Sequence, residues 1–300
     1  MNKPSFTRVE SDFESAGTRC AGWLYVPDGI QLPPVIVMAH GFGAERNWLL
    51  PKYAEIFVQT GCAVFLFDYR CFGASDGKPR NLVDPFHHVE DWRHAIRHVR
   101  AMRQVHTGKI GLWGTSYSGG HVLMIAAEDP AIRCVVALAP YVGGRGATPR
   151  VSLLHKLQAF YHGVRDVISE AVKKEPHLIA QAREPGGPFA FFPDLHSYDM
   201  IKTRLIPAGQ PWANRIPARI GLTFLFYNPI WRVSRVVCPV LIQYATEDAL
   251  APAAPVQWAA AKMNRAETAS YVCDHFDFAV GEVFQQTAKE QADFFRRHLG

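Results

Sequence analysis

The feature that most constrains this chain is a serine set among very small residues in segment 109–120, which reads KIGLWGTSYSGG. The apolar run 109–113 predicts a short buried strand, and 118–128 predicts a helix that follows almost at once. Ser116 would then lie in the turn between them. So sharp a turn tolerates only small side chains two residues before and after the serine, and Gly114 and Ser118 meet that requirement. A Gly/Ser-rich loop without chemistry has the same composition, so the hypothesis of a nucleophilic Ser116 needs partners elsewhere.

A glycine-rich turn follows another predicted strand. Residues 34–43 read PVIVMAHGFG, an apolar strand that ends in a turn. The backbone amide of Phe42 in this turn, and that of Tyr117 directly after Ser116, are the candidates to stabilise an oxyanion. His40 lies in the same turn, and we interpret it as a residue that shapes the loop by hydrogen bonding.

Two adjacent carboxylates end a third predicted strand, in segment 238–252, which reads CPVLIQYATEDALAP. A carboxylate at a strand end can orient a histidine and stabilise its cation. We choose Asp248 over Glu247 because a shorter acid is held more rigidly. The alternative is that Asp248 only caps a turn.

A histidine follows the last predicted strand, in segment 269–278, which reads ASYVCDHFDF. His275 is the candidate base that takes the Ser116 proton. Asp274 and Asp277 could each pair with it locally, although a sequence neighbour rarely reaches an imidazole nitrogen at the needed angle. Taken alone, His275 would be an ordinary surface histidine, but in the order Ser116, Asp248, His275 it completes a triad.

This order resembles the α/β-hydrolase superfamily of serine hydrolases. Segment 67–77, FDYRCFGASDG, resembles the loop after the fourth strand of that fold. With this segment upstream, the GTSYSGG turn resembles the dienelactone-hydrolase-like and acetyl-esterase-like group, and also polyketide acyltransferases built on the same scaffold. The resemblance implies an α/β fold with a mostly parallel eight-stranded sheet flanked by helices, and a helical cap inserted after strand 6.

The order of predicted elements agrees with that fold. Residues 6–27 alternate as a β-hairpin does, and from residue 35 strands and helices alternate, as in a parallel sheet. We assign 1–141 and 233–300 to the hydrolase core and 142–232 to the cap. In the cap, 151–172 predicts a helix with one apolar face, and 176–193 is rich in Pro and Gly and is expected to be irregular. Its aromatic residues either line an acyl pocket or pack the cap onto the core; they are Phe160, Phe189, Phe191, Phe192, Trp212, Phe224 and Phe226.

Composition limits the class of protein and its expected cellular location. The 300 residues are 48% hydrophobic with a net charge of +5, and the basic residues are scattered, which disfavours nucleic-acid binding. No apolar stretch approaches the ~20 residues of a membrane span, and the first residues have no signal-peptide core. Six scattered cysteines in mostly apolar segments predict reduced thiols and a cytoplasmic location.

One group of residues suggests a metal site and is interpreted otherwise. His87, Asp91, His94 and His98 share a face of one predicted helix, and we interpret that face as solvated.

The predicted activity is hydrolysis of a small-molecule ester through an acyl-serine, with no cofactor and no metal. The alternatives are an acyltransferase or thioesterase with the same triad, a less favoured peptidase, and a non-catalytic binding protein on the same fold. A homodimer remains open.

Overall fold

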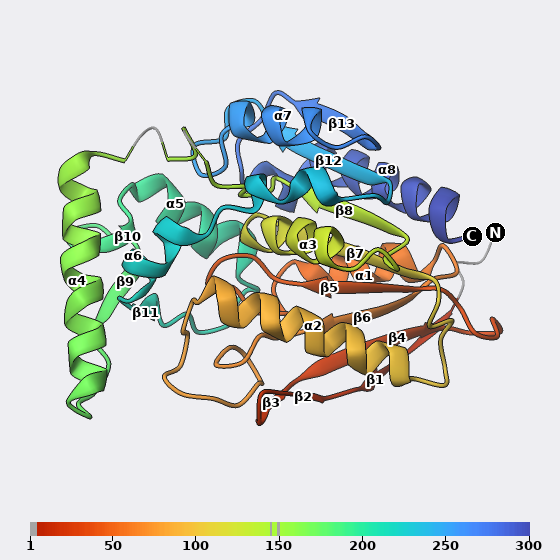
Figure 1. Cartoon of the computed structure of the whole chain (residues 1–300), viewed down its shortest axis with the longest axis horizontal. Helices are drawn as coiled ribbons and strands as arrows, with labels where there is room; N and C mark the ends of the chain where they lie inside the picture. The colour runs from red at the N-terminus through yellow and green to blue at the C-terminus, as the bar shows by residue number, and fades with distance from the viewer. Residues whose placement is uncertain (1–4, 145, 149–150) are drawn as a thin grey trace.

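The computed structural model describes residues 5–144, 146–148 and 151–300. Its centre is an eight-stranded sheet in the order β1-β4-β6-β5-β7-β8-β12-β13 (Figure 1). The parallel strands are β5 (Val35–Ala39), β6 (Ala63–Phe67), β7 (Ile110–Thr115), β8 (Cys134–Leu138), β12 (Val240–Ala245) and β13 (Ala266–Tyr271). The four central strands β5 to β8 are buried throughout except at Thr115, as expected for parallel strands covered on both faces. The predicted α/β fold is confirmed.

The antiparallel edge comes from the N-terminal segment. Strands β1 (Phe6–Glu10) and β4 (Gly22–Pro27) pair so that Phe6 lies opposite Pro27 and Glu10 opposite Trp23. A small hairpin of β2 (Phe13–Ser15) and β3 (Thr18–Cys20) lies between them in sequence. The antiparallel edge strands predicted within 6–27 are therefore present, with one extra hairpin.

Helices cover both faces of the sheet. Helices α2 (Pro85–Ala101), α3 (Tyr117–Glu128) and α7 (Ala253–Ala261) supply apolar side chains to one core cluster, and α1 (Leu50–Val58) and α8 (Gly281–Leu299) to the other (Figure 1). Because parallel strands end at one edge of the sheet, the loops after β5, β7, β12 and β13 gather there. These loops carry the residues that the sequence singled out.

The insert between β8 and β12 is mixed rather than purely helical. Helix α4 (Leu153–Ala171) matches the predicted helix. A three-stranded sheet, β10-β9-β11, accompanies it, built from β9 (Leu178–Ala182), β10 (Ala190–Phe192) and β11 (Arg215–Pro217). The expectation that 176–193 is irregular was wrong, because β9 is held by pairing with β11, a contact distant in sequence. Short helical elements complete the insert: α5 (Leu195–Met200), a π-helix (Ile201–Leu205), α6 (Ile220–Thr223), and 3₁₀ turns Phe224–Phe226, Pro229–Trp231 and Val233–Arg235.

The insert packs into the main core. Ile216, Tyr227 and Ile230 belong to the same buried cluster as the strands. The predicted domain boundaries at 142 and 232 thus remain a proposal. Within the described residues, no helix combines the length and apolar character needed to cross a bilayer.

Candidate active site

Ser116 lies in a strained turn between β7 and α3. Its φ is 55° and its ψ −118°, a left-handed backbone that a non-glycine residue seldom adopts. A Cβ on Gly114 would lie 2.4 Å from the carbonyl oxygen of Ser118, so only glycine fits there. A Cβ on Gly41, from the neighbouring loop, would lie 3.2 Å from the Ser116 Cβ. The small residues are therefore what lets the chain turn and present the hydroxyl.

Ser118 replaces the glycine that usually ends such a turn, and its hydroxyl is bonded. Its Oγ lies 2.8 Å from the Tyr69 hydroxyl, which accepts a hydrogen bond from Trp92 Nε1 at 2.9 Å. All three side chains are buried. This network anchors α3 to the loop after β6. Nothing in the local sequence pointed to it, because Tyr69 lies 49 residues earlier in the chain.

Ser116, His275 and Asp248 meet at the edge of the sheet. His275 Nε2 lies 3.0 Å from Ser116 Oγ, and His275 Nδ1 lies 2.5 Å from Asp248 Oδ2. The other Asp248 oxygen accepts the backbone N–H groups of Leu250 and Ala251 at 2.8 and 2.7 Å. Asp248 thus caps a turn and faces the imidazole at once, so the two interpretations of this residue are compatible.

The charge of Asp248 sets the protonation of His275. Burial alone would lower the pKa of this imidazole, but the charge of Asp248 and its hydrogen bond outweigh burial, and the net pKa is raised. The arrangement therefore stabilises the imidazolium that forms when a histidine takes a serine proton.

The competing acids point elsewhere. Asp274 binds His196 Nε2 at 2.6 Å through one oxygen and the Phe276 amide at 2.7 Å through the other. Asp277 pairs with Arg204 and accepts the Asp274 amide at 2.8 Å. The remaining candidate, Glu247, is exposed. Both ring nitrogens of His275 are directed at Asp248 and Ser116, which answers the question that the sequence left open about its partner.

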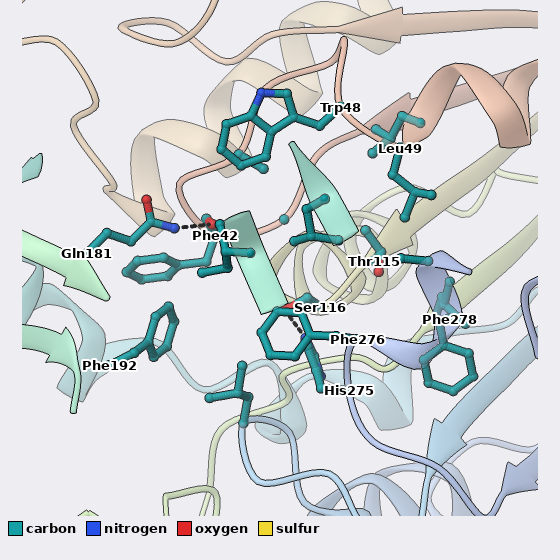
Figure 2. Close-up of a pocket in the computed structure, with 18 residues that line it drawn as sticks. Phe42, Trp48, Leu49, Thr115, Ser116, Gln181, Phe192, His275, Phe276 and Phe278 are labelled. Atoms are coloured by element: carbon teal, nitrogen blue, oxygen red, sulfur yellow. Dashed lines mark hydrogen bonds between the residues drawn. The ribbon is translucent and has the colours of Figure 1, made fainter. Parts of the chain in front are cut away.

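Two backbone amides flank the serine. Tyr117 is the first residue of α3, where an amide has no partner within the helix. Across the described residues, the Phe42 amide donates no hydrogen bond. The Phe42 carbonyl accepts Gln181 Nε2 at 3.2 Å (Figure 2). Gly43 allows this approach, because its φ is +60° and a Cβ there would lie 2.5 Å from Gln181. Sequence reasoning missed Gln181, which comes from the insert.

His40 is buried in the same loop. Its Nδ1 donates to the Gly41 carbonyl at 3.0 Å, and burial lowers its pKa to about 4. A neutral histidine that braces the loop fits the structural role predicted for it.

Two cavities of very different size meet at Ser116. The smaller, of about 80 Å³, has walls that include Trp48, His275 and Phe276 (Figure 2). The larger, of about 840 Å³, lies under the insert and is lined by residues that include Tyr117 and Tyr141. Both are mostly apolar.

The aromatic residues of the insert fall into three groups. Phe191, Phe192 and Phe224 line the large cavity. Phe160 and Phe226 are exposed. The remaining two pack within the insert: Phe189 stacks on His155 and His162, and Trp212 packs against Tyr198.

Three residues of the apparent metal motif have separate partners, and the fourth, His87, is exposed. Asp91 is fully buried and binds Ser15 Oγ at 2.6 Å and Arg70, which corrects the expectation of a solvated face. His94 lies against the Glu14 carbonyl and His98 against Ser11. In the part of the chain that is described, no group of three or more His, Cys, Asp or Glu side chains is arranged to hold a metal ion.

Comparison with known proteins places this geometry in a family. The family model for X-Pro dipeptidyl-peptidases (S15 family) matches residues 16–185, a span that includes Ser116. The chain belongs to the S15 family of α/β-hydrolases. A relative from Acinetobacter baumannii (strain MDR-ZJ06), named quorum-quenching protein AidA, is 33% identical over 99% of this chain and 97% of its own length. The protein is therefore a hydrolase of this family.

Further relatives carry other names. A polyketide transferase from a Penicillium species is 24% identical over 100% of this chain and 99% of its own, and a thiohydrolase from Eupenicillium brefeldianum is 25% identical over 95% and 92%. The crystal structure of the α/β-hydrolase GrgF from Penicillium sp. sh18 superposes with a TM-score of 0.85 at 24% identity, over 98% of this chain and 99% of that one. That structural likeness shows the shared fold.

Proposed function

We propose that this hydrolase cleaves carboxylic esters through an acyl-serine intermediate. Ser116 is the nucleophile and His275 is the general base. Asp248 orients the imidazole and stabilises its cation. The observation that carries the proposal is the continuous contact from Asp248 Oδ2 to His275 Nδ1 and from His275 Nε2 to Ser116 Oγ. Acyl transfer to serine requires a carboxylate, a base and a nucleophile in continuous contact.

The proposed reaction has two balanced halves. Ser116 Oγ attacks the carbonyl carbon while its proton passes to His275 Nε2, and the Phe42 and Tyr117 amides stabilise the oxyanion. Collapse breaks the bond to the leaving group, which takes the proton from His275. A water molecule then attacks the acyl-serine, giving its proton to His275, and collapse returns a proton to Ser116 and releases the acid.

The unequal cavities suggest which part of the substrate goes where. Among the described residues, His275 lines the small cavity but not the large one. Because His275 must protonate the leaving atom, the leaving group belongs on its side. One water needs about 10–15 Å³ of such space, so about 80 Å³ accommodates roughly six water-sized groups. We therefore assign a short leaving group to the small cavity and a bulky, apolar acyl group to the large one.

A pair of isomeric esters tests the activity and the assignment together. Methyl 2-naphthylacetate has a bulky acyl group and a small leaving group, and 2-naphthylmethyl acetate reverses them. We expect Ser116-dependent hydrolysis with kcat/KM at least about tenfold higher for the methyl ester. The opposite preference would overturn the cavity assignment alone. Turnover of an X-Pro anilide but of neither ester would overturn the ester proposal in favour of the peptidase activity that the family description names.

The second candidate is acyl transfer to an alcohol or amine, or release from a thioester. Relatives named polyketide transferase and thiohydrolase, which align over more than nine-tenths of this chain, favour it. The same residues would act, and only the acceptor would differ. Incubating a 2-naphthylacetyl thioester with and without an alcohol separates them, because a transferase would form ester in preference to free acid.

We propose a cytoplasmic location from the state of the thiols. All six cysteines are free and buried, as expected for a protein kept in a reducing cytoplasm.

A further inference from the structure

One face of α4 exposes apolar side chains instead of burying them. Eight of them are between 44% and 73% exposed: Leu153, Leu154, Leu157, Phe160, Tyr161, Val167, Ile168 and, just past the helix, Val172. The opposite face, with Ala159, Gly163 and Asp166, is the buried one. Figure 1 shows α4 at the outer side of the insert, with β9 and α6 on its inner side. The apolar pattern at 151–172 thus marks a surface that this chain leaves uncovered.

The exposed stripe has the spacing of a coiled-coil seam. Its central positions are separated by alternating steps of three and four residues: Leu154, Leu157, Tyr161, Val164, Ile168 and Ala171. A second apolar row, at seven-residue intervals, contains Leu153, Phe160 and Val167. A sustained heptad pattern fits the grooves of another helix.

We propose that α4 pairs antiparallel with α4 of a second copy of this chain, about a two-fold axis between Tyr161 and Val164. That register sets Leu154 against the partner's Ala171, and Tyr161 against the partner's Val164. Large side chains then meet small or branched ones in each layer, which is how a seam fills without gaps. A two-fold interface uses the same patch on both copies.

The charges beside the stripe select the antiparallel orientation. Lys156 and Glu170 lie on the same flank, both exposed. In this antiparallel register Lys156 lies opposite the partner's Ser169, so its long side chain is one residue from the partner's Glu170, whereas a parallel pair would bring like charges together. Glu170 also contacts Arg219 at 2.6 Å, but it is 60% exposed and its carboxylate can accept a second cation.

The area available matches a stable dimer. Eight half-exposed apolar side chains offer on the order of 100 Å² each, or roughly 800 Å² from each copy, which is about what one partner contributes to a standard interface. This proposal does not depend on the chemistry proposed for Ser116.

Sedimentation velocity over a concentration series tests the pairing. We expect a dimer for the wild type and a monomer for Leu157→Glu/Ile168→Glu, with an unchanged far-UV circular dichroism spectrum as evidence of folding. The matched control is Val272→Glu, at an apolar residue that is 84% exposed on the core and should stay dimeric. A wild type that stays monomeric up to about 100 μM would overturn the proposal.

A charge exchange tests the orientation. Lys156→Glu should raise the dimer dissociation constant about tenfold, and adding Glu170→Lys should restore it. Failure of the double variant to recover would rule out the antiparallel register. If the wild type is monomeric, its flotation with anionic vesicles can be measured. Flotation of the wild type that is lost in Leu157→Glu/Ile168→Glu would identify a lipid surface, and not a second copy, as the occupant.

Discussion

Asp248 and His275 lie 27 residues apart in sequence, yet their Oδ2 and Nδ1 atoms are 2.5 Å apart. The loops after β12 and β13 bring them together because these strands are parallel neighbours. Asp248 is held from its other oxygen by two backbone amides, so the carboxylate is fixed before it meets the imidazole. Rigid placement of this kind is what a positioning acid must have.

Replacing Asp248 should be far more costly than replacing either neighbouring acid. Asp248→Asn keeps an oxygen for the two amides but loses the charge, and we expect kcat to fall on the order of 10⁴-fold. Asp274→Asn, whose partner His196 is exposed, should stay within about threefold of the wild type. Steady-state kinetics of both variants checks this, and a reversed ranking would show that the acid is wrongly assigned.

Activity should depend on pH through His275. Only the neutral imidazole can accept the Ser116 proton, and its pKa is raised, so activity is lost as pH falls through a value above the ordinary one of about 6.5. In Asp248→Asn, burial still lowers the pKa of His275 and the two raising effects of Asp248 vanish, leaving only the smaller raising effect of the Asp274 charge, so the midpoint of the residual activity should shift to lower pH. Profiles of kcat/KM measure both, and an unchanged midpoint in the variant would contradict the origin of the shift.

Ser118 should contribute to stability rather than to chemistry. Ser118→Ala leaves the buried Tyr69 hydroxyl without its closest partner, and we expect a loss of about 1–2 kcal/mol in the free energy of unfolding. Urea denaturation compares it with Ser270→Ala, at an exposed position of β13. Equal stability of the two variants would mean that the hydrogen bond between Ser118 and Tyr69 contributes nothing.

Gly114 should not tolerate even a methyl group. In Gly114→Ala the Cβ would meet a backbone carbonyl at 2.4 Å, and we expect a loss of more than about 2 kcal/mol in stability. Gly108→Ala is the control, since the nearest atom to a new Cβ there is a His106 side-chain carbon at 3.3 Å. Thermal unfolding of the two proteins separates them, and a Gly114→Ala protein as stable as the control would show that the turn can relax.

Trp48 should limit the leaving group. It is buried at the wall of the small cavity, so Trp48→Leu enlarges that space while keeping an apolar contact. We expect the ratio of kcat/KM for benzyl over methyl 2-naphthylacetate to rise about tenfold. Trp258→Leu, at a half-exposed residue of α7, serves as control. If the ratio is unaffected by Trp48→Leu, the small cavity does not hold the leaving group.

The sheet and the residues at the strand ends could be predicted from the sequence because both have local signals. The small residues around Ser116 and the acid and histidine that follow two later strands are visible without any structure. The choice among Glu247, Asp248, Asp274 and Asp277 was less secure, since it depends on which other groups each carboxylate contacts. His196 binds Asp274 and Arg204 pairs with Asp277, and both of these partners come from the insert.

The insert was harder to predict for a physical reason. Strand β9 lies in a segment rich in Pro and Gly, and it exists through pairing with distant residues. The periodicity of 151–172 correctly indicated a helix with an apolar face. It did not say what that face contacts, because the same stripe serves a core and an exposed surface equally well.

Covalent labelling with a fluorophosphonate tests the central claim most directly. The wild type should gain one adduct, and peptide mapping should place it on Ser116. The Ser116→Ala protein should gain none, and His275→Ala should react far more slowly because its serine is no longer deprotonated. A folded wild type that stays unlabelled, or an equal adduct on Ser116→Ala, would contradict the proposal that Ser116 is the nucleophile.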